Sequence, residues 1–151
     1  FHDCSIDMLT VHLSGGEDML KKAMLAAKTI KTKIIGVSIL TSLAESDSLA
    51  LFNNNLNDQM LNLFRLAKKT NLDGIVCSPL EVAMANTILD KHSIKITPGI
   101  REISVVDDQV RTMNAKEAIK NGATFLVIGR PITQAKDISI ALQSFSASIY
   151  E

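Results

Sequence analysis

Two segments near the end of the sequence combine glycine with arginine. Residues 98–101 read Pro-Gly-Ile-Arg after one apolar run, and Gly129 and Arg130 follow the next run. Glycine lets backbone N–H groups approach an anion closely, and a guanidinium can bind two phosphate oxygens at once. Either piece alone could be a turn glycine or a surface ion pair. Two such pieces at neighbouring strand ends favour a phosphate-binding site.

Two weaker candidates accompany this pair. Residues 107–111 read Asp-Asp-Gln-Val-Arg, where the Gln109 amide could donate to a phosphate oxygen as the loop closes over a ligand; a solvated polar loop is the alternative. His12 stands beside Gly15 and Gly16. A histidine in an apolar strand is more often hydrogen-bonded within the core, so we keep His12 only as a supporting residue. The sequence carries no metal-ligand spacing, Walker loop, dinucleotide fingerprint or nucleophile elbow.

The elements that must position these residues alternate between two types. Short β-branched, apolar runs alternate with helical stretches, which predicts parallel strands buried on both faces. The segment 42–55 is predicted to be a polar loop. The predicted strands are 8–13, 33–39, 73–77, 93–97 and 124–128, and the predicted helices are 16–28, 56–69, one starting at Pro79, 115–121 with Gly122 as C-cap, and 138–149.

Length and composition indicate one α/β domain spanning residues 1–151. Hydrophobic residues make up 46%, and sixteen basic residues balance sixteen acidic ones, which argues against nucleic acid or a membrane surface as a partner. Cys4 and Cys77 stand far apart, so we expect two buried thiols in a reducing compartment. No apolar run has the length of a membrane span, and the cytoplasm is the expected location.

Five βα units can be counted, at intervals of about 30 residues. An open doubly wound sheet accepts five strands, whereas a closed βα barrel needs eight. Strand number alone favours the doubly wound sheet. The glycine–arginine loops favour the barrel, because barrels bind phosphate at the ends of their last strands.

Taken in order, the loops resemble those of orotidine 5′-monophosphate decarboxylases of the bacterial type. The resemblance implies a TIM-type (β/α)8 barrel that acts as a homodimer with active sites at the interface. It also implies conversion of orotidine 5′-monophosphate to UMP in pyrimidine biosynthesis, without metal or cofactor. The matching stretches are 1–3, 11–16, 37–42, 76–78, 97–101, 107–111 and 127–133.

The resemblance also assigns roles to individual residues. Asp3 matches the second aspartate of the family's Asp-x-Lys-x-x-Asp motif, which reaches the partner's active site, and is the catalytic candidate. Thr41 would contact the amide edge of the pyrimidine. The implied substrate-binding set is Phe1, His2, Asp3 and Thr41, with Arg101, Gln109, Gly129 and Arg130 on the phosphate.

The sequence departs from the family pattern at its beginning. The motif's lysine would immediately precede Phe1, and the family's crossover helix does not follow Asp3. Three residues cannot form a parallel crossover, so we expect a segment to be missing between residues 3 and 4, and three N-terminal strands to be missing too. Two alternatives remain: a magnesium-dependent sugar-phosphate decarboxylase or aldolase of the same barrel group, and a noncatalytic phosphate-binding fragment.

Overall fold

The structure, a computed structural model, describes residues 5–101 and 111–150. Its strands are β1 (Met8–His12), β2 (Lys33–Val37), β3 (Gly74–Val76), β4 (Ile94–Thr97) and β5 (Phe125–Leu126). Its helices are the 3₁₀ turn η1 (Leu13–Gly15), α1 (Gly16–Ile30), α2 (Glu45–Phe52), α3 (Leu56–Lys69), α4 (Val82–Ile88), α5 (Ala115–Lys120), α6 (Arg130–Thr133) and α7 (Ile138–Tyr150). None of these described helices is long and apolar enough to cross a membrane.

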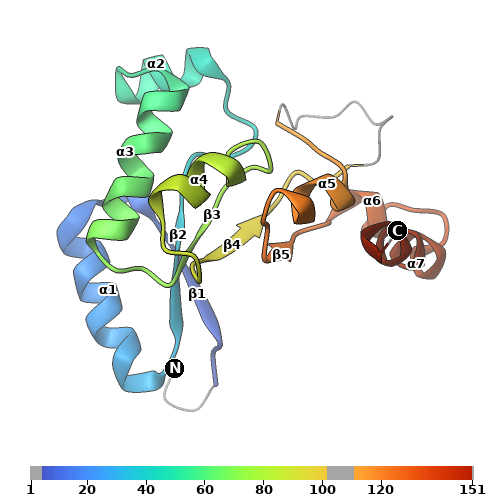
Figure 1. Cartoon of the computed structure of the whole chain (residues 1–151), viewed down its shortest axis with the longest axis horizontal. Helices are drawn as coiled ribbons and strands as arrows, with labels where there is room; N and C mark the ends of the chain where they lie inside the picture. The colour runs from blue at the N-terminus through green and yellow to red at the C-terminus, as the bar shows by residue number, and fades with distance from the viewer. Residues whose placement is uncertain (1–4, 102–110, 151) are drawn as a thin grey trace.

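The order of the strands decides between the two predicted architectures. All neighbouring pairs are parallel, and the order in the described sheet is β1-β2-β3-β4-β5 (Figure 1). A doubly wound sheet reverses its strand order at a switch point, whereas a βα barrel adds each strand beside the previous one. The described residues therefore form five consecutive units of a TIM-type barrel, and the predicted fold class is confirmed.

The two faces of the sheet have different surroundings. Ile75 of β3 is fully buried in a core with Met60 and Phe64 of α3 and Val82 of α4. Figure 1 shows α1, α3 and α4 along one side of the sheet, with α5, α6 and α7 gathered near β5. Since side chains alternate along a strand, Val76 points to the opposite face, which is less covered. A second core joins α5 and α7, where Ile100, Ala115, Ala118, Ala123 and Phe145 are buried.

The predicted loop 42–55 is wrong, because it contains helix α2. Asp47 accepts a hydrogen bond from the backbone N–H of Ala44 (2.8 Å), and this contact supports the helix start. Ser48 is fully buried and donates to the carbonyl of Asn54 (3.0 Å). Helix α4 begins at Val82, three residues later than predicted from Pro79.

Candidate functional site

A cavity of about 250 Å³ lies at the C-terminal ends of the middle strands. Val37 and Val76 line it from the less covered face of the sheet, and Pro98 lines it from the end of β4. Barrel enzymes place their active sites at this edge, in the loops after the strands. The full lining is Val37, Ile39, Leu40, Thr41, Ser42, Val76, Cys77 and Pro98.

Thr41, the predicted contact for the pyrimidine, lies in the turn after β2 and lines this cavity. The turn is closed by a hydrogen bond from the backbone N–H of Leu43 to the carbonyl of Leu40 (3.0 Å). A Cβ added to Gly99 would lie 3.8 Å from Cγ2 of Thr41. The structure therefore brings Thr41 to the first of the two predicted phosphate segments.

That first segment, at the end of β4, is held by backbone hydrogen bonds. Arg101 donates its N–H to the carbonyl of Met113 (3.0 Å), and Met113 donates to Gly99 (3.3 Å). The Arg101 side chain is buried, and its Nη1 donates to the carbonyl of Ile100 (2.8 Å). Its role on phosphate stays a prediction.

The second predicted segment follows β5 on the neighbouring strand. Val127 donates its backbone N–H to Thr97 (2.9 Å), which continues the ladder between β4 and β5. Gly129 then caps α6, and the exposed Arg130 is the first residue of that helix. Apart from its chain neighbours, a Cβ added to Gly129 would meet no atom of the described residues within 4 Å.

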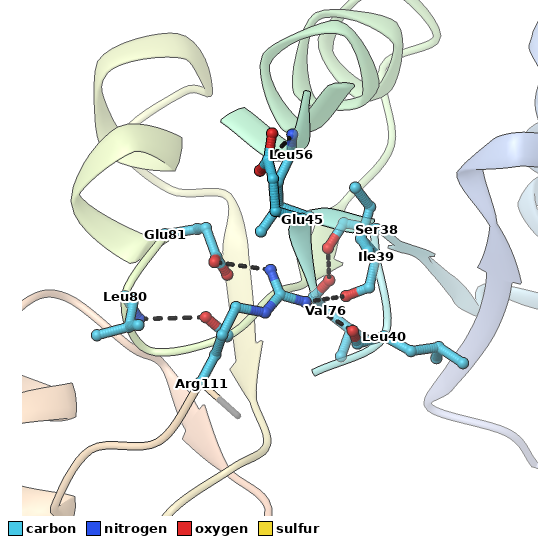
Figure 2. Close-up of polar contacts among 10 residues, drawn as sticks. Ser38, Ile39, Leu40, Glu45, Leu56, Val76, Leu80, Glu81 and Arg111 are labelled. Atoms are coloured by element: carbon cyan, nitrogen blue, oxygen red, sulfur yellow. Dashed lines mark hydrogen bonds and ion pairs between the residues drawn. The ribbon is translucent and has the colours of Figure 1, made fainter. Parts of the chain in front are cut away.

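Arg111 forms a polar cluster that the sequence did not reveal. Its Nη1 pairs with Oε1 of Glu81 at 2.8 Å, and the two side chains are only 6% and 9% exposed. Its Nη2 donates to the carbonyls of Leu40 (2.6 Å) and Ile39 (3.2 Å), as Figure 2 shows. Glu81 carried no sequence signal, and Arg111 was only the last residue of a matching stretch.

Cys77 is among the residues that line the cavity, and its side chain is buried in the core, as predicted. Burial raises its pKa to about 12, with a further contribution from the negative charge of Glu81. A thiol with this pKa is protonated at neutral pH, so Cys77 is not an activated nucleophile.

Other sequence candidates have different outcomes. His12, kept only as a supporting residue, is exposed at the end of β1, so it is not the core histidine that was the alternative. Phe1, His2, Asp3 and Gln109 lie outside the described residues, as does Cys4. Within residues 5–101 and 111–150, no three His, Cys, Asp or Glu side chains gather closely enough to hold a metal ion.

Comparison with known proteins identifies the group to which this architecture belongs. The family model described as "Orotidine 5'-phosphate decarboxylase / HUMPS family" matches residues 2–145. The chain belongs to this family. The match confirms the resemblance inferred from the loops, and it includes both glycine–arginine segments.

Individual relatives agree with the family match. The chain is 44% identical over 133 residues to an orotidine 5'-phosphate decarboxylase of Wolbachia pipientis, and 41% identical over 152 residues to one of Actinobacillus pleuropneumoniae. These alignments cover 87% and 97% of the chain, but 59% and 66% of the relatives.

A solved structure gives the same result. The crystal structure of orotidine 5'-phosphate decarboxylase from Lactobacillus acidophilus is similar with a TM-score of 0.78 and 31% identity. The match covers 97% of this chain and 65% of that one. The chain thus spans about three fifths to two thirds of the length of these relatives.

Proposed function

We propose that this chain serves the decarboxylation of orotidine 5′-monophosphate to UMP in pyrimidine biosynthesis. The observation that carries the proposal is the placement of Thr41 beside Gly99, in a cavity at the strand ends. A nucleotide needs one group of residues for its base and another for its phosphate. The Thr41 turn and the two glycine–arginine segments are suited to these tasks.

In this proposal the phosphate lies against the ends of β4 and β5. Arg101, Gln109, Gly129 and Arg130 bind it, and Thr41 contacts the pyrimidine. The phosphate is remote from the bond that breaks. Its binding energy can still order the site and keep water out during the reaction.

The chemical step requires stabilisation of a carbanion. Loss of CO₂ leaves an electron pair at C6 of the pyrimidine, which takes up one proton to give UMP. An ammonium group between carboxylates stabilises this charge and then donates the proton. By family resemblance the ammonium is a lysine whose place is immediately before Phe1. Asp3 is the neighbouring carboxylate, and Phe1 and His2 lie between them.

The proposal extends to assembly and location. Since Asp3 matches the aspartate that reaches the partner subunit, we propose a homodimer with active sites at the interface. In this proposal residues 1–151 belong to a single barrel domain whose N-terminal strands they do not include, and the protein works in the cytoplasm on a small nucleotide, without a cofactor.

The experiment measures binding and turnover separately. UMP binding to the protein is measured by calorimetry, and orotidine 5′-monophosphate is then supplied while its absorbance and the formation of UMP are followed. We expect UMP binding by this chain, and turnover by a protein in which the lysine precedes Phe1. Binding without turnover would favour a noncatalytic phosphate-binding protein, and absence of both would contradict the proposed site. Turnover that requires added magnesium would favour the related sugar-phosphate enzymes.

A further inference from the structure

Three strand ends converge at the cavity, and one side chain connects them. Arg111 lies two residues before Met113, which forms a parallel bridge with Ile100 and donates its backbone N–H to the carbonyl of Gly99 at the end of β4. Its guanidinium crosses to the carbonyl of Leu40, directly before Thr41, and to Glu81 before α4 (Figure 2). These contacts join residues 71 and 30 positions apart in the chain.

We propose that Arg111, held by Glu81, is a positioning residue that fixes Thr41 relative to the end of β4. The inference rests on the proposed function, in which Thr41 binds the base and the end of β4 binds the phosphate. Arg111 itself touches neither group. It sets the span between the two halves of the nucleotide site.

The orientation of the guanidinium supports this role over simple charge pairing. A bidentate ion pair would use a second guanidinium nitrogen and the second carboxylate oxygen, and is the stronger arrangement. Here Nε of Arg111 and Oε2 of Glu81 are buried without a hydrogen-bond partner among the described residues. Nη2 is directed instead at the carbonyls of Ile39 and Leu40. The guanidinium is thus oriented toward the turn that carries Thr41.

Arginine is required for this connection because of its shape. A planar guanidinium can donate to a carboxylate on one side and to carbonyls on the other, whereas an ammonium is a compact group on a flexible stem. Arg111→Lys keeps a positive charge beside Glu81, but its single ammonium group is less able to donate to Glu81 and to the carbonyls of Ile39 and Leu40 at the same time. We therefore expect Arg111→Lys to be intermediate between wild type and Arg111→Met.

The test compares two probes on the whole chain. UMP spans both halves of the site, and ribose 5-phosphate occupies only the phosphate half. In Arg111→Met, we expect the affinity for UMP to fall at least tenfold and that for ribose 5-phosphate to fall less than threefold. Arg65→Met makes the same chemical change on the exposed surface of α3 and is the control.

A buried Glu81 left without its partner is expected to destabilise the fold. Glu81→Leu combined with Arg111→Met removes both charges and serves as the second variant, with the same loss of UMP affinity expected. If both probes weaken equally in this variant, or if neither weakens, the positioning role is wrong.

Amide hydrogen exchange tests the connection without any ligand. The Leu43 N–H bonds to the Leu40 carbonyl, the same oxygen that accepts from Arg111. In the double variant we expect Leu43 to exchange at least tenfold faster, while the amides of Thr70 and Leu72 stay unchanged. Unchanged exchange at Leu43, or equal acceleration everywhere, would overturn the inference. If wild-type protein binds neither probe, the proposed function fails, and this exchange result alone decides the role of Arg111.

Discussion

The carbonyl oxygen of Arg111 lies where a side chain on Gly99 would have to go. A Cβ added to Gly99 would come within 2.8 Å of this oxygen. Gly99 also has φ near +80°, in the left-handed region that favours glycine. The close approach accompanies the parallel bridge between Ile100 and Met113, and the Arg111 side chain contacts the turn after β2.

Gly99→Ala should therefore be strongly destabilising. The positive φ and the contact with a backbone oxygen together cost about 2–4 kcal/mol of the free energy of unfolding. Urea denaturation followed by circular dichroism measures the change. Gly129→Ala is the matched control, since its added methyl group meets no described atom within 4 Å. Equal losses in the two variants would contradict this account of Gly99.

The sequence was sufficient to predict the elements that have strong hydrophobic periodicity. All five strands lie within the predicted runs, and α3 has the predicted bounds. Helix α2 was missed because the stretch from Ser42 to Asn55 is polar and its start depends on the side chain of Asp47. Strand number alone favoured the wrong architecture, because the distinction between a doubly wound sheet and a barrel lies in strand order.

The candidate site was predicted less completely. Thr41 and the glycine–arginine segments could be located because each follows a strand, and parallel strands end at one edge. The pair of Arg111 and Glu81 could not be predicted in this way. Its partners are brought together only by the packing of the turn after β2 against α4 and the end of β4.

The buried thiol of Cys77 should make stability depend on pH in the alkaline range. Its pKa is about 12 in the folded chain, compared with 9.0 for an ordinary cysteine. The unfolded chain therefore releases the thiol proton first, and stability is lost as the pH rises from 9 toward 12. At pH 10 the loss is about 1 kcal/mol.

Urea denaturation at pH 7 and pH 10 measures this contribution of Cys77. Cys77→Ala has no thiol and should not show the alkaline loss of stability. The free energy by which wild type exceeds the variant should therefore be smaller at pH 10 than at pH 7, by the loss given above. A thiol reagent at pH 7, applied in a Cys4→Ala background, should react only after unfolding. Rapid labelling of the folded chain would show that Cys77 is accessible.

Glu17 connects α1 to α3 at the surface and should titrate at low pH. Its carboxylate accepts from Lys21 (2.7 Å) and Lys69 (2.6 Å), and these hydrogen bonds lower its pKa from 4.5 to about 2. The stability it contributes is present above pH 4.5 and is lost as the pH falls toward 2.

Carbon-detected NMR of the Glu17 carboxyl group measures this midpoint directly. Because both lysines are exposed, 1 M salt should raise the midpoint toward the ordinary value. Glu17→Gln should reduce the loss of stability between pH 5 and pH 2, and Glu117→Gln on the surface of α5 is the control. A midpoint near 4.5 at low salt would show that the two ion pairs do not persist in solution.

Arg130 should make a large contribution to nucleotide binding and little to the fold. Its side chain is exposed at the start of α6, directly after Gly129, which the family resemblance also places on the phosphate. A charge-assisted hydrogen bond to phosphate contributes about 1.5–3 kcal/mol. Arg130→Ala is therefore expected to weaken UMP binding by about 10- to 100-fold, with the urea midpoint almost unchanged.

The comparison with uridine separates a phosphate contact from a general disturbance of the site by Arg130→Ala. Uridine lacks the phosphate, so its weaker binding should be the same in wild type and variant. Where the protein turns over orotidine 5′-monophosphate, kcat/KM should fall by at least as much as UMP affinity, because phosphate binding also stabilises the transition state. Arg65→Ala controls for the loss of an exposed positive charge. An unchanged kcat/KM in Arg130→Ala would show that Arg130 does not bind the phosphate.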